Sequence, residues 1–341
     1  MPLLSLVLCS RNDDYGGNAR WRIETALNYL ALQAHRLGRL AEIEVVVSDW
    51  GSSTPLRCAV TLTRAAASIT RFLETPAELA QALQKDSPFA EVLANNAAIR
   101  RASGTYIGRI DQDTLVGSGL LERCLNYAGG KVAPFCGIES GFLFCGRRAI
   151  PFDFARRSPQ LDAVDAFVKR YGRMLSPEGL CQRPFFDAPV GLVLLHRAVW
   201  HHYRGYDERL LYWGFMETDL ALRMAGALEV VNLEPFLGRD LYHLGHSPRR
   251  ICVTTRRKNP RRYPSDRVPN SSAWGLAAHH LELRYARAAD NEADPSLHDS
   301  TSTGSLIRYF PAVMLDSIWN AGLGAGRLVR GVLRGDRIVR A

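Results

Sequence analysis

Strand-like and helix-like segments alternate through the first 115 residues, and this alternation limits the fold more than any other feature of the sequence. The expected strands lie at 3–9, 43–47 and 106–110, and the expected helices lie at 21–34, 77–85 and 89–101. Each strand is a short apolar run, and each helix carries apolar side chains at helical spacing. Repeated β-α-β order predicts a mostly parallel sheet with helices on both faces.

The second half of the chain has a more mixed pattern. It predicts strands at 142–144, 191–195 and 228–233, a helix at 217–224 and a loop-rich stretch at 146–188, and 58–62 and 69–73 add short strands in the first half. We expect one α/β domain with two halves, 1–115 and 116–288. A linker at 289–304, rich in Asp, Ser and Thr, then leads to an amphipathic helical tail at 305–341.

Composition narrows the class of protein. The chain has 341 residues, enough for one large core or two modest ones. Its seven cysteines form no C-x-x-C pair, which favours free thiols in a reducing compartment. The apolar start lacks a basic leader and is expected to be a buried strand, and no stretch reaches the ~20 apolar residues of a membrane span. These features predict a cytoplasmic protein.

The net charge of +9 is unevenly spread along the sequence. Seven cations and no acid lie between Arg249 and Arg262, and the tail adds six arginines against two aspartates. Such an excess favours anionic partners, although a solvated basic face explains it equally simply. The sequence contains no recognisable nucleic-acid module, so we expect no nucleic-acid partner. The tail is interpreted either as a contact with the inner face of the membrane or as a homodimer surface.

Polar residues follow three of the expected strands in the first half: Arg11 and Asn12, then Asp49, then Asp111 and Asp113. The ends of parallel strands meet at one edge of a sheet, where α/β proteins bind ligands. The two acids of Asp111-Gln112-Asp113 are hard oxygen donors that suit Mg²⁺ or Mn²⁺, and such an ion suits a diphosphate. A surface turn is the simpler interpretation of the same pattern.

The second half contributes further candidates. Glu217 lies at an expected helix start beside Trp213, where a carboxylate can act as a general base. Trp213 offers a flat face to a sugar ring or belongs to the core. His246, one strand later, can complete a metal site begun by the acidic pair, whereas His243 is interpreted as a core histidine. Asp219 also fits a simple helix-start acid.

Taken in order, these motifs resemble the nucleotide-sugar-dependent glycosyltransferases of the GT-A fold, close to glycosyltransferase family 2. The matching segments are Asp49-Trp50-Gly51-Ser52, Ala94-Asn95-Asn96-Ala97-Ala98-Ile99, Asp111-Gln112-Asp113, Gly205-Tyr206-Asp207-Glu208, Trp213 to Leu220, and His243 to His246. The resemblance covers roughly residues 3–250. It implies a Rossmann-like, mostly parallel central sheet flanked by helices, here with a C-terminal helical extension.

The resemblance also implies roles for single residues. Asp113, assisted by Asp111, and His246 would bind Mn²⁺ or Mg²⁺, and Glu217 with Asp219 would serve catalysis. The nucleotide sugar would be bound by Arg11, Asn12, Asp49, Asn96, Asp111 and Trp213. Met216 departs from the family pattern, because family members carry an acid there; Glu217 would then act without its usual neighbour.

The expected function is a metal-dependent transfer of a sugar from a nucleotide diphosphate sugar to a glycan or lipid-linked acceptor in polysaccharide biosynthesis. The donor that we expect is a UDP-sugar. Glu217 as base implies inversion at the anomeric carbon, whereas some relatives with two such histidines retain configuration. Two alternatives stay open: a sugar-phosphate nucleotidyltransferase of related fold, and a non-catalytic anion-binding protein.

Overall fold

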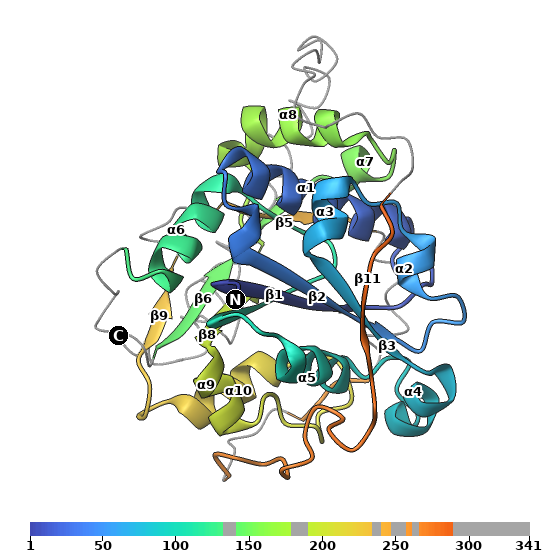
Figure 1. The fold of residues 1–341 in the computed structure, drawn as a ribbon, viewed down its shortest axis with the longest axis vertical. Coiled ribbons are helices and arrows are strands. Elements are labelled where there is room, and N and C mark those ends of the chain that lie inside the picture. Colours follow the sequence, from blue (N-terminus) through green and yellow to red (C-terminus); the bar gives the residue numbers. More distant parts are fainter. Residues whose placement is uncertain (132–140, 179–189, 234–239, 247–256, 261–265, 289–341) are drawn as a thin grey trace, which may run out of the picture.

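The computed structural model describes residues 1–131, 141–178, 190–233, 240–246, 257–260 and 266–288. A large sheet crosses this part of the chain, with helices on both of its faces (Figure 1). Its eight strands are β1 (Leu4–Ser10), β2 (Ile43–Trp50), β3 (Thr70–Thr75), β4 (Tyr106–Ile110), β6 (Phe142–Gly146), β8 (Val190–His196), β9 (Val230–Asn232) and β11 (Leu283–Tyr285). They lie in the order β11-β3-β2-β1-β4-β8-β6-β9.

Four of the seven strand pairs in this sheet are parallel: β1 with β2, β1 with β4, β2 with β3, and β6 with β9. Strand β8 is antiparallel to both β4 and β6, so it joins the two halves of the chain into one sheet. A second, three-stranded sheet consists of β5 (Thr114–Val116), β10 (Leu241–Leu244) and β7 (Arg148–Ile150), with β10 in the middle. The mostly parallel α/β fold expected from the sequence is confirmed.

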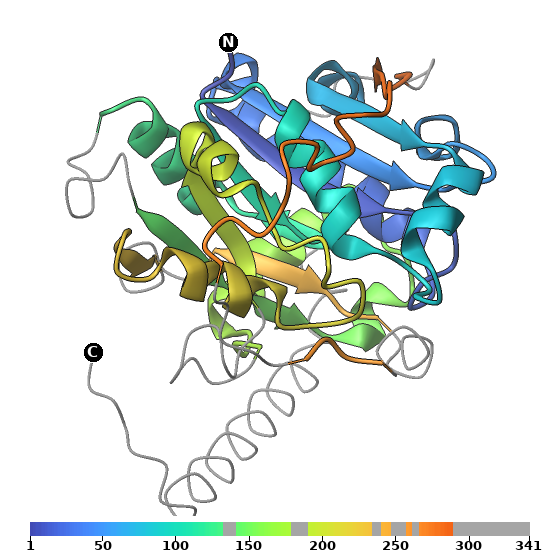
Figure 2. The same ribbon diagram turned by 90° about the horizontal axis from the view of Figure 1, so that it is seen from below.

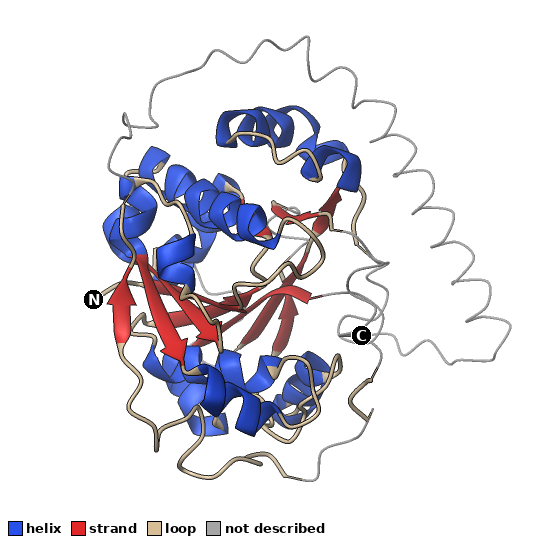
Figure 3. Ribbon diagram, turned by 90° about the vertical axis from the view of Figure 1, so that its right-hand side faces the viewer, coloured by secondary structure: helices blue, strands red, loops and turns tan. Residues whose placement is uncertain are grey.

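Helices cover both faces of the large sheet, as the edge-on view in Figure 3 shows. One side carries α1 (Ala19–Arg36), α2 (Leu56–Ala59), α3 (Arg64–Ile69), α6 (Ser118–Ala128), α7 (Phe152–Ala155) and α8 (Leu161–Tyr171). The other carries α4 (Ala77–Gln84), α5 (Glu91–Arg101), α9 (Arg197–Tyr203) and α10 (Met216–Met224), of which Figure 2 shows α5, α9 and α10 together. Two short 3₁₀ turns are η1 (Leu40–Glu42) and η2 (Gly172–Met174).

The sequence of β1 explains this layering. Leu4, Leu6 and Leu8 point into the hydrophobic cluster on the α1 side, whereas Val7 belongs to the cluster on the α5 side. Side chains alternate between the faces of a strand, so a continuous apolar run requires cover on both. Burial of each such side chain contributes about 1.5–3 kcal/mol. The strands therefore hold their polar ends rigidly at one edge.

Two expectations from the sequence are wrong. Residues 58–62 do not form a strand; Leu56–Ala59 is a helical turn with Leu56 fully buried. The stretch 146–188 is not mainly loop, because it contains β7, α7 and α8. In α8, Val164, Phe167 and Tyr171 recur at helical spacing and are buried, a pattern that the surrounding polar residues obscured.

The linker expected at 289–304 and the helical tail expected at 305–341 lie outside the described residues. Their proposed roles, a membrane contact or a dimer surface, therefore stay predictions. Among the helices that the structure describes, none combines the length and the apolar character that crossing a membrane requires.

Candidate active site and metal centre

The polar residues that follow β1, β2 and β4 lie close together, as the sequence predicted. Ser10 pairs with Asp49 in the register of β1 and β2, and the Ser10 hydroxyl donates a hydrogen bond to Gln112 Oε1. The Asn12 N–H donates to Ser52 Oγ over 2.8 Å. These contacts bring the three strand ends to one edge of the sheet.

Three of the predicted nucleotide-binding residues are engaged in holding this edge. Asp49 is 2% exposed and accepts hydrogen bonds from the Ser52 hydroxyl and from the Leu56 N–H at 2.7 Å. Burial raises the pKa of Asp49 to about 6, although both hydrogen bonds oppose the shift. The Asn12 amide donates to the Thr54 carbonyl, and Arg11 donates to the Pro88 carbonyl, both at 2.9 Å.

A candidate metal centre lies just after β4. Asp113, His243 and His246 each offer a ligand atom, and these atoms lie within 4.8 Å of one another. His243 Nε2 is 3.4 Å from Asp113 Oδ1, and His246 Nε2 is 3.9 Å from Asp113 Oδ2. One carboxylate and two imidazoles suit Mn²⁺ and other first-row metals. His246 Nδ1 is buried without a hydrogen-bond partner among the described residues.

The two histidines differ in their surroundings. Burial and Arg147 oppose a charge on His243, but Asp113 and Glu178 outweigh them and raise its pKa to about 9. Burial lowers the pKa of His246 to about 4, so this ring is neutral and ready to act as a ligand at pH 7. The sequence singled out His246 and left His243 in the core; the structure places both beside Asp113.

Asp113 is also held by a buried arginine of α1. Arg22, with 1% of its side chain exposed, donates to Asp113 Oδ2 and to the Tyr15 carbonyl. Burial alone would raise the pKa of Asp113, but His243, Arg22 and His246 hold it well below its usual range. Asp113 is therefore a permanent anion, with Oδ1 turned toward His243.

Asp111 does not belong to the group around Asp113. It forms ion pairs with Arg109 at 2.6 Å and with Arg147. Arg109 is 4% exposed and also pairs with Glu91 and, at 3.2 Å, with Glu217. One guanidinium thus joins acids from β4, α5 and α10.

Glu217 lies in the first turn of α10, with 18% of its side chain exposed. Burial raises its pKa, and Arg109 partly offsets this shift. A carboxylate with a raised pKa accepts a proton more readily, as a general base must. Met216, where the sequence resemblance led us to expect an acid, is 3% exposed and packs in the cluster on the α5 side. Arg109 is therefore the neighbour of Glu217 in this chain.

Three other candidates take different positions. Asp219 is 3% exposed and pairs with Arg223 at 2.9 Å inside the domain. Asn96 is fully buried, and its amide bonds the backbone N–H and C=O of Tyr206, each at 2.8 Å. Trp213 is 46% exposed, and Lys258 Nζ lies 5.2 Å from its ring. Of these three side chains, Trp213 is the most exposed.

Five residues of the charge cluster around Asp113 and Glu217 escaped the sequence analysis: Arg22, Glu91, Arg109, Arg147 and Glu178. Arginine and glutamate carry no motif of their own, so only the pairing of distant strands reveals them. Among the described residues, five acids of this cluster face three arginines: Glu91, Asp111, Asp113, Glu178 and Glu217 against Arg22, Arg109 and Arg147. His243, whose pKa is raised to about 9, adds a further positive charge to the same cluster.

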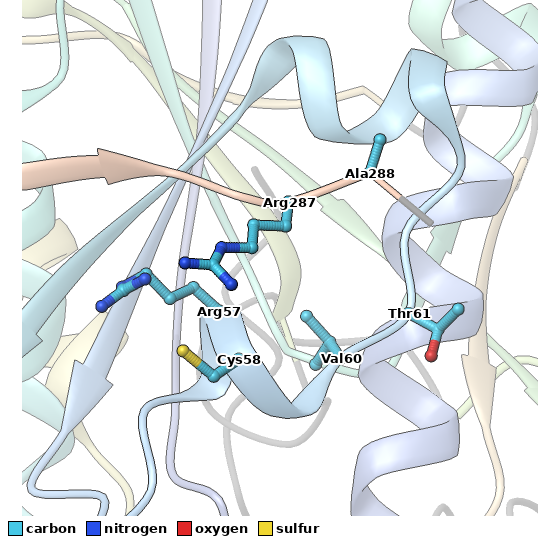
Figure 4. Close-up of a pocket in the computed structure, with 6 residues that line it drawn as sticks. All are labelled: Arg57, Cys58, Val60, Thr61, Arg287 and Ala288. Atoms are coloured by element: carbon cyan, nitrogen blue, oxygen red, sulfur yellow. The ribbon is translucent and has the colours of Figure 1, made fainter. Parts of the chain in front are cut away.

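A separate pocket opens on the α2 side of the molecule (Figure 4). It is lined by Arg57, Cys58, Val60, Thr61, Arg287 and Ala288. None of these residues belongs to the polar cluster, and the Arg57 guanidinium is already paired with Glu74.

No family model and no curated protein matches the sequence. Among solved structures, a fragment of TarS from S. aureus is similar at 16% identity over 71% of this chain and 60% of its own, with a TM-score of 0.43. A mannosyltransferase from Pyrobaculum calidifontis, in complex with GDP-Man and Mn²⁺, is similar at 17% identity over 68% of this chain and 54% of its own, with a TM-score of 0.40. A Drosophila galactosyltransferase in complex with manganese, UDP-Gal and xylobiose is similar at 13% identity over 77% of this chain and 76% of its own, with a TM-score of 0.39. Such low identities and TM-scores assign no activity to this chain.

Proposed function

We propose that the chain is a metal-dependent glycosyltransferase that moves a sugar from a nucleotide diphosphate sugar to a glycan or lipid-linked acceptor. Among such donors, we propose a UDP-sugar. The observation that carries this proposal is the group of Asp113, His243 and His246 at the ligand-binding edge of the sheet, in one cluster of charges with Glu217. A partly buried carboxylate with a raised pKa, connected to the candidate metal centre through the ion pairs of Arg109 and Arg147, provides with it both functions that transfer at an anomeric carbon needs.

In the proposed reaction, the acceptor oxygen forms a bond to the anomeric carbon while the bond from that carbon to the diphosphate oxygen breaks. Glu217 accepts the proton of the acceptor hydroxyl, and the electron pair of the broken bond leaves with the diphosphate. A divalent cation held by Asp113, His243 and His246 would neutralise the charge on that diphosphate. Arg109 holds Glu217 in place, and Trp213 offers its exposed face to a sugar ring.

Attack opposite to the leaving group inverts the configuration, as the role of Glu217 requires. The anomeric configuration of the product, measured by NMR, tests this part of the proposal. A retained configuration would remove Glu217 as the base and leave the metal site intact.

A thermal-shift panel tests the class of reaction and the nucleotide. UDP, GDP, CDP and dTDP are each added with and without Mn²⁺, and we expect metal-dependent stabilisation by one of them, UDP first. Asp113→Ala should abolish this shift. Asp153→Ala, which removes an exposed acid paired with Arg156, is the matched control and should keep it. No stabilisation of the unaltered protein by any diphosphate would contradict the proposal.

A further inference from the structure

We propose that Glu178 is a positioning residue of the metal centre: it fixes the ring of His243 so that Nε2 faces the cation. This inference rests on the proposed function, because it takes Asp113, His243 and His246 as the metal ligands. His243 contacts a carboxylate on each side. Its Nδ1 lies within hydrogen-bond distance of Glu178 Oε1, and its Nε2 is 3.4 Å from Asp113 Oδ1.

The backbone holds these three residues on neighbouring segments of the small sheet, of which only His243 lies within a strand. In the small sheet, His243 of β10 lies opposite Thr114 of β5, the residue after Asp113, and opposite Ala149 of β7 on its other side. The segment that carries Glu178 continues this sheet beyond β7. The Glu178 N–H donates to the Arg147 carbonyl over 2.9 Å, and the Ala149 N–H donates to the Ser176 carbonyl over 3.0 Å.

The second oxygen of Glu178 is engaged as well. Arg147 Nε donates to Oε2, and the same guanidinium binds Asp111. With Arg147 on one oxygen and His243 on the other, the carboxylate of Glu178 has a fixed orientation and is not turned toward Asp113. Glu178 therefore affects the metal centre through its contact with His243 and not through a contact with the ion.

The contact between Glu178 and His243 Nδ1 affects metal binding through the chemistry of the imidazole ring. When a cation displaces the proton on Nε2, a ring that donates Nδ1–H to a carboxylate presents its lone pair from Nε2, the atom that faces Asp113. A carboxylate in this position fixes the tautomer and the ring orientation and makes the ligand more basic, and its loss weakens metal binding about 10- to 100-fold. We therefore expect Glu178 to determine Mn²⁺ affinity without touching the ion.

The test measures Mn²⁺ binding to the full-length protein by isothermal titration calorimetry, without nucleotide. Glu178→Leu should weaken Mn²⁺ binding by about 10- to 100-fold. Glu178→Gln should weaken it less, because an amide oxygen still accepts from Nδ1–H. Glu24→Gln, which changes the charge equally at a carboxylate that accepts from the Thr61 N–H, should bind Mn²⁺ as the unaltered protein does.

A double-mutant cycle separates this role from a purely structural one. In the His243→Gln background, Glu178→Leu should cause no further loss of affinity, because its effect passes through the histidine. An equal loss with and without His243 would overturn the proposal, and so would unchanged Mn²⁺ binding in Glu178→Leu.

NMR of ¹⁵N-labelled histidine with Zn²⁺, a diamagnetic probe, gives a second readout that remains if Glu178→Leu does not fold. We expect the Nδ1–H tautomer of His243 in the unaltered protein and a partial loss of it in Glu178→Gln, because an amide can present either its oxygen or its NH₂ group to Nδ1. An unchanged tautomer together with unchanged affinity in Glu178→Gln would overturn the proposal. If the unaltered protein binds UDP with Mn²⁺ while all Glu178 variants match it, this inference fails and the proposed function stands. If the unaltered protein binds no Mn²⁺, both fail.

Discussion

At the scale of single residues, the site depends on buried arginines that each hold more than one group. Arg109 pairs with Glu91, Asp111 and Glu217, and Arg147 pairs with Asp111 and Glu178. Removing one partner of a buried ion pair leaves an uncompensated charge, and that loss exceeds what the intact pair contributes. The buried carboxylates of the site therefore depend on these arginines to compensate their negative charge.

Replacing Arg109 by Met should destabilise the protein by about 3–5 kcal/mol, because three carboxylates lose their shared cation in a buried place. The free energy of unfolding in urea measures this effect. Arg156→Met is the control, because Arg156 and Asp153 are both more than half exposed and their pair contributes at most about 1 kcal/mol. Equal losses in the two variants would contradict the importance of the buried cluster.

Asp49 gives a prediction on pH. Its pKa rises from 3.8 to about 6 on folding, so the folded protein binds this proton more tightly than the unfolded chain. The resulting stability is present below pH 4 and is lost as the pH rises through 6, by up to about 3 kcal/mol. The unfolding free energy of the unaltered protein minus that of Asp49→Asn should fall by this amount between pH 4 and pH 7. A flat difference would show that the Asp49 carboxylate is not desolvated.

At the scale of elements, the start of α10 determines where Glu217 lies. Gly214 and Phe215 both have positive φ, at 81° and 65°, and turn the chain so that Met216 enters the core and Glu217 faces Arg109. Asn259 fixes this turn by bonding the backbone of Tyr212 and the Gly214 carbonyl. The position of the proposed base is thus a property of the turn before the helix.

Glycine substitutions test this turn. Gly214→Ala should cost about 1–2 kcal/mol, because only the left-handed backbone opposes it and no atom lies within 4 Å of the added Cβ. Gly226→Ala, at φ 80° in equally open space, should cost the same. Gly205→Ala should cost clearly more, because its Cβ would lie 2.2 Å from Asn96 Oδ1. Urea unfolding of the three variants gives the ranking, and equal costs would contradict it.

The sequence predicted the helices and strands better than it predicted the side-chain contacts of the candidate site. The strands β1, β2 and β4 and the edge that carries Asp49, Asp111 and Asp113 were predictable, because continuous apolar runs and parallel order determine them. Of the partners of Asp113, His246 was predictable from the sequence, but Arg22 and His243 were not, since they reach it only through the packing of α1 and the register of β10. Helical periodicity in α8 was present but masked by its charged neighbours.

At the scale of the whole molecule, the two halves of the chain are joined by more than the sheet. Asn96 of α5 bonds the backbone of Tyr206, which leads toward α10, and α5 packs beside α9 over the same face of the sheet (Figure 2). Because the Asn96 amide forms these hydrogen bonds, it helps to hold the first half of the chain against the second half.

Asn96→Ala should therefore destabilise the protein by about 1–3 kcal/mol, since it leaves the Tyr206 N–H buried without its acceptor. The affinity for the nucleotide diphosphate should change little in the folded fraction. Urea unfolding and calorimetric titration measure the two effects. A large loss of affinity at unchanged stability would instead support a direct contact between Asn96 and the nucleotide.

The small sheet also has a consequence for the order in which the protein is made. Asp113 leaves the ribosome about 130 residues before His243, so at ordinary translation speeds it waits roughly 6 to 26 seconds for its partner. During that time the first strands and helices can fold, but β10 is not yet available to pair with β5. The three side chains of the candidate centre therefore come together only after β10 is made, and a nascent chain that ends before β10 lacks two of them.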